Sequence, residues 1–127
     1  MESEWPEQLK PLHWIGPAKR ELKALPGEVQ NELGYDLWLV QTGGRPRSAK
    51  VLKGFGGADV LELVDNYDGD TYRAVYTVRF RRAVYVLHAF KKKSRHGIGT
   101  PGSELDVVRL RLQGAAEDYA RRYCDER

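Results

Sequence analysis

Cationic side chains gather in one stretch of the sequence. From Thr71 to Ser103 the chain has no acidic residue, although it contains 18 acidic and 21 basic residues overall. Arg73 lies near the start of this stretch, and Lys91, Lys92, Lys93, Arg95 and His96 follow later. Guanidinium and ammonium groups pair with phosphate through charge-assisted hydrogen bonds. The sequence therefore predicts a surface that binds phosphate, in a nucleic acid or in a nucleotide.

A β-hairpin is predicted to bring these cations together. Tyr72–Phe80 and Ala83–Phe90 are rich in Val, Tyr and Phe, and Arg81-Arg82 separate them by a hairpin-sized gap. With a two-residue turn the expected pairs are Phe80 with Ala83, Tyr76 with Leu87, and Arg73 with Phe90 beside Lys91 and Lys92. Arg-Arg is not a favoured turn, so a longer loop with a shifted register stays open.

A second cationic stretch precedes the hairpin. Residues 45–57 contain Arg45, Arg47, Lys50 and Lys53 and no acidic residue. The stretch has little hydrophobic periodicity, so we expect a loop or a partly ordered crossing segment. Its cations are further candidates for binding phosphate.

The whole chain sets limits on these interpretations. Its 127 residues suit one domain, residues 1–127, with residues 1–10 as a loose, polar arm, and the formal net charge is +3. Cys124 is the only cysteine, which excludes an internal disulfide and favours a reducing, cytoplasmic setting. No apolar run is long enough to span a bilayer. No spacing of His, Cys or carboxylates is typical of a metal site, and no cofactor is expected.

Helices are predicted at both ends of the chain, with strands between them. A short strand, Leu12–Ile15, precedes two helices: the first spans Ala18–Leu25, and the second ends at Gly43-Gly44. The second helix has an apolar stripe of Val29, Leu33, Leu37 and Val40. Strand Val60–Val64, an Asp-Gly turn within residues 66–70, and the hairpin follow. Thr100 is expected to cap a final amphipathic helix that has Pro101 at its first position.

This order predicts an α+β domain: a small, mostly antiparallel sheet with two N-terminal helices and one C-terminal helix. The order and its residues resemble the RelE/ParE toxin superfamily, and within it the HigB-like, phage-derived branch. The resemblance covers roughly residues 12–112. The phrases that carry it are Ala24-Leu25-Pro26, Lys53-Gly54, Val60-Leu61-Glu62-Leu63, Tyr72-Arg73-Ala74-Val75-Tyr76, and Val86-Leu87-His88-Ala89-Phe90-Lys91-Lys92-Lys93-Ser94.

The resemblance implies a toxin of a type II toxin–antitoxin system. Such a toxin binds the ribosome and cleaves mRNA, and a helix-turn-helix antitoxin neutralises it in a hetero-oligomer. ParE-type relatives instead poison DNA gyrase on the same fold. A gyrase poison, or an inactive relative that only binds its antitoxin, therefore stays as an alternative to the endoribonuclease.

Cleavage of RNA needs a base for the 2′-OH, a cation for the phosphoryl oxygens and an acid for the leaving 5′-oxygen. Arg73 is the first candidate for the cation, because its fixed donors match phosphate and it also matches the strand arginine of RelE-type nucleases. Lys92 is favoured by the family motif, and His96 could exchange a proton near neutral pH. Lys50 or Lys53 could serve as a base beside other cations. The expected phosphate-binding residues are Lys50, Lys53, Lys91, Lys93 and Arg95.

Structural roles compete with these functional ones. Arg73 could pair with Asp65 or Glu62 across the sheet. The lysine run could be an ordinary solvated strand end. His88 and His13 are interpreted as packed, structural residues. The hairpin aromatics could stack on bases but more often fill a core; they are Tyr72, Tyr76, Tyr85 and Phe90.

Overall fold

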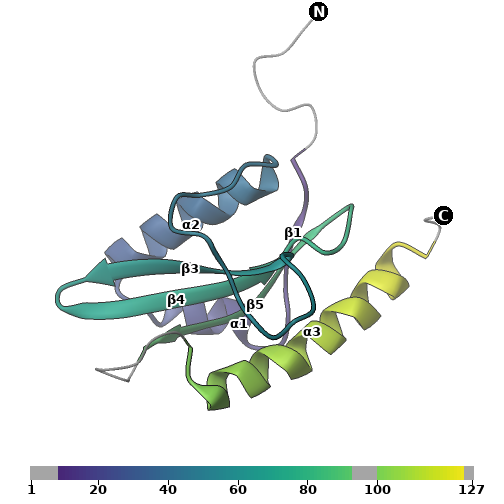
Figure 1. Cartoon of the computed structure of the whole chain (residues 1–127). Helices are drawn as coiled ribbons and strands as arrows, with labels where there is room; N and C mark the ends of the chain where they lie inside the picture. Colours follow the sequence, from purple (N-terminus) through teal and green to yellow (C-terminus); the bar gives the residue numbers. More distant parts are fainter. Residues whose placement is uncertain (1–8, 93–99, 125–127) are drawn as a thin grey trace, which may run out of the picture.

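The computed structural model describes residues 9–92 and 100–124 (Figure 1). Its elements are β1 (Leu12–Trp14), α1 (Ala18–Lys23), α2 (Gly27–Gln41), β2 (Lys50–Val51), β3 (Val60–Tyr67), β4 (Asp70–Thr77), β5 (Val84–Lys91) and α3 (Gly102–Arg122). The strands form one sheet in the order β1-β5-β4-β3-β2. The pair β1–β5 is parallel and the other pairs are antiparallel. This confirms the predicted α+β class with its mostly antiparallel sheet.

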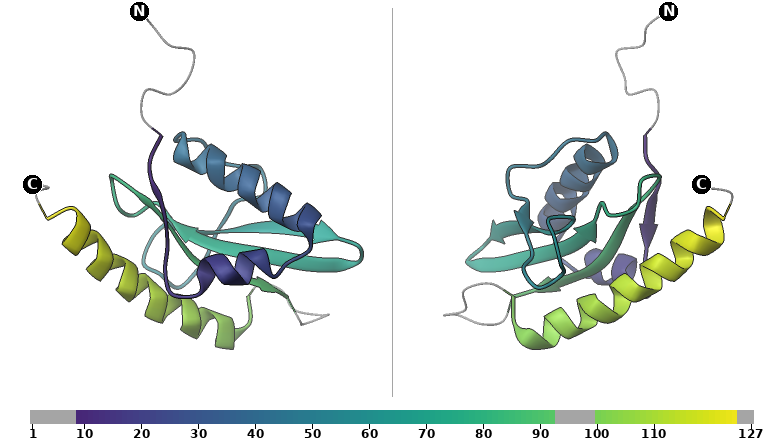
Figure 2. Two further views of the ribbon diagram at one scale, coloured as in Figure 1. Left: turned by 180° about the vertical axis from the view of Figure 1, so that it is seen from behind. Right: turned by 45° about the vertical axis from the view of Figure 1, so that its right-hand side comes forward.

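The helices cover opposite faces of the sheet. Helices α1 and α2 lie on one face, and α3 runs along the other (Figures 1 and 2). Each face has its own apolar core, because strand residues alternate between the two sides. Leu33 and Leu37 of α2 pack with one set of strand residues, and Val108 and Ala115 of α3 pack with the other. The site described below lies on the α3 face.

Helix α2 forms where the sequence predicted it. Val29, Leu33, Leu37 and Val40 are all buried, as the apolar stripe requires. Gly43 has a φ of +94°, which is the left-handed conformation that commonly ends a helix. The N–H of Gly44 then donates to the carbonyl of Leu39 at 2.9 Å, so the helix end is satisfied by the chain itself.

The predicted register of the β4–β5 hairpin is correct near Arg73 and wrong near the turn. Arg73 faces Phe90 as predicted, but Tyr76 faces Val86 and not Leu87. A β-bulge between Val75 and Tyr76 absorbs the difference, since Leu87 is an extra residue on β5. The bulge restores the predicted register before the strand reaches Arg73.

The connection between β4 and β5 is longer than the predicted turn. Strand β4 ends at Thr77, and the N–H of the next residue, Val78, still donates to the carbonyl of Asp59, beside the start of β3, at 3.0 Å. Arg79 also binds the Asp59 carboxylate, at 3.0 Å. These bonds keep residues 78 and 79 beside β3 and away from β5. Arg81 and Arg82 do lie in a turn, but strands do not flank it directly.

Other boundaries also differ from the prediction. The Asp68-Gly69 turn is tight, with positive φ at both residues, so β3 runs on to Tyr67. The cationic loop contains the short edge strand β2. Lys10, which we assigned to a loose arm, exchanges hydrogen bonds with Gln41 at 3.1 and 2.7 Å; residues 1–8 lie outside the described part.

Thr100 does not cap α3, so this prediction was wrong. The helix begins at Gly102 after Pro101, and no side chain caps its first turn. The Thr100 hydroxyl instead donates a charge-assisted hydrogen bond to Oε2 of Glu62 at 2.6 Å. In the described part of the chain, no helix combines the length and apolar character needed to cross a membrane.

Candidate functional site

A pocket of about 410 Å³ lies where the sheet edge meets the start of α3. We call it the basic pocket. Its walls come from β2 and the residues after it, from β3, from β4, and from the segment that enters α3. The lining residues are Lys50, Val51, Leu52, Lys53, Glu62, Arg73, Thr100 and Leu105. Segments far apart in the sequence thus place two lysines, an arginine and a glutamate around one cavity.

Arg73 and Glu62 form an ion pair inside this pocket. Nη1 of Arg73 donates to Oε1 of Glu62 at 2.6 Å, and their side chains are 8% and 6% exposed. The pair forms because β3 and β4 are adjacent and both residues point to the α3 face. Asp65, the other predicted partner, faces Tyr72 in the register and so belongs to the opposite face. The predicted pairing of Arg73 with Glu62 is confirmed.

One donor of Arg73 remains unused. Its Nε is buried and has no hydrogen-bond partner within residues 9–92 and 100–124. A buried donor left without a partner costs about 1–3 kcal/mol, and charged groups cost more. Arg73 is therefore held through Nη1, which binds Glu62 at 2.6 Å and lies 3.4 Å from the Thr100 hydroxyl, while its Nε is left without a partner among the described residues.

The predicted phosphate-binding lysines separate into two groups. Lys50 and Lys53 line the basic pocket with Arg73. Lys91 does not line it: Lys91 faces Tyr72 in the register and forms an ion pair with Asp70 at 3.2 Å. The backbone N–H of Lys92 donates to the carbonyl of Thr71, so the β4–β5 pairing continues to this position. Because strand residues alternate between faces, Lys92 lies on the same sheet face as Phe90 and Arg73. Lys93, Arg95 and His96 lie outside the described residues.

Two polar residues of the pocket were not assigned a chemical role from the sequence. Glu62 was considered only as a partner of Arg73, and Thr100 only as a helix cap. The signal for Glu62 was an acidic residue inside the apolar run Val60–Val64. A charged residue in a buried strand indicates an ion-pair or hydrogen-bond partner, because burying an unpaired charge is costly. For Thr100 the sequence offers no such signal.

His88 belongs to a separate buried network. Its Nδ1 lies 2.9 Å from a Glu21 oxygen, and its Nε2 lies 2.6 Å from Glu104. Arg111 donates to Glu21 at 2.8 Å and to the Leu87 carbonyl at 3.0 Å. The network ties α1, β5 and α3 together, which confirms His88 as a packed residue. Burial alone would raise the pKa of Glu21, but hydrogen bonds from Arg111 and His88 lower it overall.

His13 is also structural in this fold. Its Nε2 lies 2.9 Å from the hydroxyl of Tyr123, so it links β1 to the end of α3. Burial and the nearby Arg122 lower the pKa of His13. Neither His13 nor His88 lines the basic pocket. The predicted aromatics fill the two cores and are buried; they are Tyr72, Tyr76, Tyr85 and Phe90.

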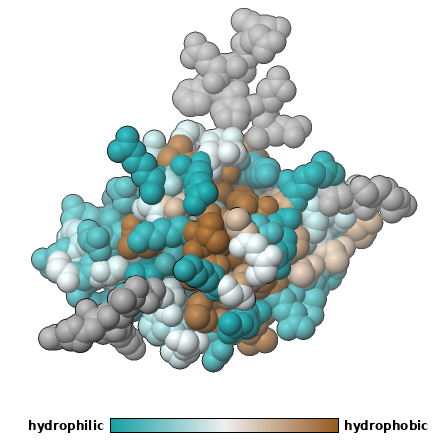
Figure 3. All heavy atoms as spheres, in the orientation of Figure 1, coloured by the Kyte–Doolittle hydropathy of each residue, from teal (hydrophilic) through white to brown (hydrophobic). Residues whose placement is uncertain are grey.

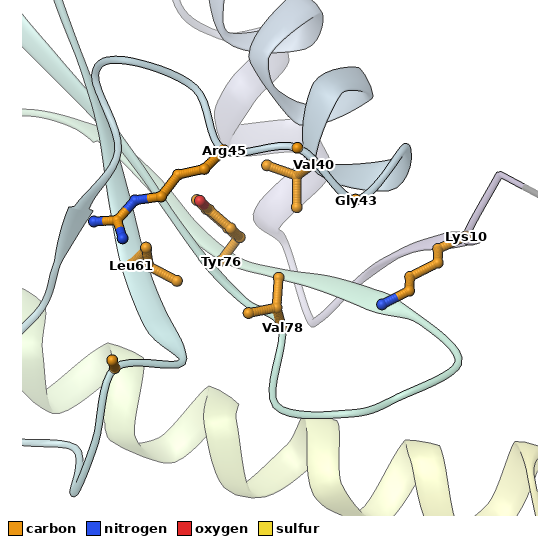
Figure 4. A pocket seen from close by; sticks show the side chains of 9 residues that line it. Lys10, Val40, Gly43, Arg45, Leu61, Tyr76 and Val78 are labelled. Carbon is orange, nitrogen blue, oxygen red and sulfur yellow. The ribbon is translucent and has the colours of Figure 1, made fainter. Parts of the chain in front are cut away.

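A second pocket, of about 370 Å³, lies between the end of α2 and the sheet (Figure 4). Lys10 and Arg45 border it, and Val40, Leu61 and Tyr76 form part of its wall. Burial raises the pKa of Tyr76 to about 12, so its hydroxyl stays protonated at neutral pH. Among its described lining residues there is no carboxylate or histidine. This pocket therefore lacks the acid–base groups that the basic pocket has.

The face seen in Figure 1 combines apolar and charged surface. In Figure 3, hydrophobic side chains gather near the middle of this face and hydrophilic ones surround them. The basic pocket has the same mixture, since Val51, Leu52 and Leu105 line it with the charged groups. Within the described residues, no cluster of three or more His, Cys, Asp or Glu side chains could hold a metal ion.

Similarity to solved structures identifies the fold. The chain is similar to the toxin RelE of Escherichia coli, solved in the free state as an arginine-to-alanine double mutant, with a TM-score of 0.56 and 20% sequence identity. The match covers 83% of this chain and 96% of RelE. The five-stranded sheet with its three helices is therefore a RelE-like α+β fold.

The family follows from the sequence. Residues 20–113 match the family model "Phage derived protein Gp49-like (DUF891)", and the chain belongs to this family. The predicted RelE-like, phage-derived family is confirmed. A further similar structure is the RelBE2 toxin–antitoxin complex of Mycobacterium tuberculosis, with a TM-score of 0.47, 17% identity, and coverage of 74% of this chain and 100% of that chain. Among curated proteins there is no match.

Proposed function

We propose that this protein is the toxin of a type II toxin–antitoxin system and that it cleaves mRNA on the ribosome as a HigB-like endoribonuclease. The observation that carries the proposal is the basic pocket, where Lys50, Lys53 and Arg73 converge and a buried guanidinium nitrogen has no partner. Membership of the phage-derived family and the RelE-like fold support it. In this proposal the cleavage follows attack of a 2′-OH on the adjacent phosphate.

The pocket suits a phosphodiester for reasons of charge and shape. The described lining residues include three cations and one carboxylate, so this part of the lining has a net positive charge. Arg73 is held by Glu62 through Nη1, and we propose that its Nε, which has no partner among the described residues, donates to a phosphoryl oxygen when RNA is bound. A preorganised donor stabilises charge that develops in the transition state without having to reorient. Lys50 and Lys53, which are exposed, add positive charges to the same pocket.

The lysines and His96 extend this proposal beyond the pocket. Lys92 follows β5 on the sheet face of Arg73, so we propose that it contacts the RNA near the scissile phosphate. Lys91, Lys93 and Arg95 are proposed to bind the RNA backbone on either side. His96 is proposed to exchange protons during cleavage. The proposed partners are the ribosome with its mRNA and a cognate helix-turn-helix antitoxin.

A non-nuclease function is the second candidate. The ion pair with Glu62 neutralises the charge of Arg73, which would suit a protein that uses this arginine only to hold its fold. A ParE-like poison of DNA gyrase, or a relative that only binds its antitoxin, would need Arg73 only for this structural role. These functions differ from the nuclease in a direct observable, since neither cuts mRNA.

Primer extension on a reporter mRNA after induction of the protein tests the proposal. The samples are the wild type, Lys50→Ala combined with Lys53→Ala, and the same RNA without ribosomes. Lys19→Ala, at an exposed position on α1, is the matched control for loss of a cation. We expect cuts in the translated region that need ribosomes and the pocket lysines but not Lys19. Growth arrest with intact mRNA would overturn the nuclease.

A further inference from the structure

Glu62 has the geometry of a reacting group as well as that of an ion-pair partner. Its Oε1 accepts from Arg73 at 2.6 Å and its Oε2 accepts from Thr100 at 2.6 Å. A carboxylate offers about four lone-pair positions, so roughly half of its accepting capacity remains. Glu62 is buried, 4% exposed, and yet it lines the basic pocket. Its free accepting positions are therefore available to a group that enters the pocket.

The ion pair places a proton acceptor beside a phosphate-binding donor. In RNA the 2′-OH is attached to the carbon next to the one that carries the scissile phosphate. A nuclease of this kind therefore needs its base and its phosphate-binding cation close to each other. Glu62 and Arg73 satisfy this requirement, because their side chains meet at 2.6 Å and the unused Nε belongs to the same guanidinium.

Other described candidates for the base fit less well. His88 is enclosed between Glu21 and Glu104 and does not line the basic pocket. Tyr76 belongs to the second pocket and carries its proton at neutral pH. In the described lining of the basic pocket, Glu62 is the one carboxylate and no histidine occurs.

We infer that Glu62 is the general base that takes the proton from the 2′-OH; this inference rests on the nuclease function proposed above. As the proton moves to a Glu62 oxygen, the 2′-oxygen forms a bond to phosphorus and the bond from phosphorus to the 5′-oxygen breaks. The products are a 2′,3′-cyclic phosphate and a 5′-hydroxyl. The leaving oxygen receives a proton from the ammonium of Lys50 or Lys53. Proton transfer from Glu62 to that lysine through solvent then restores both groups.

The test is single-turnover cleavage of ribosome-bound mRNA by Glu62→Gln and Glu62→Ala. Glutamine keeps the shape and can still accept from Arg73, but it is no longer a base. We expect Glu62→Gln to slow cleavage by about 10²–10⁴-fold, the usual contribution of a general base. Its binding to ribosomes loaded with 2′-O-methylated mRNA, which cannot be cut, stays at the wild-type level. Glu117→Gln, an exposed carboxylate on α3, is the matched control and cleaves like the wild type.

Chemical rescue distinguishes a base from a residue that only positions Arg73. Glu62→Ala leaves space for a small carboxylate, so added formate should restore part of its cleavage, whereas it should not affect Glu62→Gln. Cleavage by Glu62→Gln at the wild-type rate overturns the inference and leaves the nuclease intact. Loss of cleavage without rescue of Glu62→Ala by formate also overturns it and assigns Glu62 to positioning. Absence of cleavage by the wild type overturns the nuclease itself and the inference with it.

Discussion

Arg73 and Glu62 are joined by a 2.6 Å ion pair that is more than nine-tenths buried, although they come from different strands. This contact connects the stability of the sheet with the proposed chemistry of the basic pocket. A single substitution of either residue is therefore expected to change both the stability and the proposed activity. Experiments on this site therefore need variants that separate folding from activity.

The first prediction concerns that separation. Arg73→Ala leaves the Glu62 carboxylate buried without its partner, so we expect the free energy of unfolding to fall by about 3–5 kcal/mol. The double substitution of Arg73→Met with Glu62→Leu removes both charges and should recover most of that loss. Urea denaturation of the three proteins measures the effect. In primer extension both variants should fail to cut mRNA; cleavage by the stable double variant would exclude the pocket as the active site.

The pocket lysines make a prediction about salt. Each lysine that contacts an RNA phosphate contributes about 0.7 to the slope of log affinity against log salt concentration for single strands. Replacing Lys50 and Lys53 by alanine should therefore reduce the slope by roughly 1.4. Titrations of single-stranded RNA at several salt concentrations measure it. Lys19→Ala should leave the slope unchanged, and an unchanged slope in the pocket variant would show that these lysines do not contact the RNA.

Glu21 makes a prediction about pH. Its folded-state pKa is lowered from 4.5 by Arg111 and His88, against the effect of burial. A carboxyl with a lowered pKa stabilises the fold above its unfolded pKa, and this stabilisation is lost as the pH falls through the folded pKa. Glu21→Gln should therefore lower the melting temperature at neutral pH, and the difference from the wild type should shrink below pH 4.5. A difference that stays constant over this range would contradict the role of the ionised carboxylate.

Gly43 makes a prediction about backbone geometry. An L side chain in its left-handed conformation, with a φ of +94°, costs roughly 1–2 kcal/mol. Gly43→Ala should lower the free energy of unfolding by about that amount and leave the rate of mRNA cleavage unchanged. Gly27→Ala is the control, because a Cβ there meets no atom within 4 Å and the φ is not positive. Equal destabilisation by both substitutions would show that the α2 terminus does not set the effect.

The arrangement of elements could be predicted because local signals are strong in this chain. The stripe from Val29 to Val40, the Asp68-Gly69 turn and the dense Val/Tyr hairpin each determine their own element. The pairing of Arg73 with Phe90 could also be predicted, by counting residues back from the Arg81-Arg82 turn. The pairing of Tyr76 could not be predicted in this way, because the loop is longer than the assumed turn and a bulge between Val75 and Tyr76 shifts the register.

The site could be predicted only in part. Arg73, Lys50 and Lys53 carry the signal of their charge, and the structure brings them to one pocket. Thr100 was assigned to a helix cap by local preference, but a buried carboxylate 38 positions away competes for its hydroxyl. Local patterns contain no information about such distant acceptors. For this reason the sequence indicated candidate cations, and it offered His96, Lys50 and Lys53 for proton transfer without deciding between them.

The entry of α3 is attached to the sheet at two points with different surroundings. Thr100 binds Glu62 inside the basic pocket, and Glu104 binds His88 outside it. A ligand that hydrogen-bonds to Glu62 or Thr100 therefore changes the free energy with which α3 packs on the sheet. By reciprocity, the packing of α3 changes the affinity for that ligand. The start of α3, from Thr100 to Glu104, thus couples the basic pocket thermodynamically to the buried network around His88.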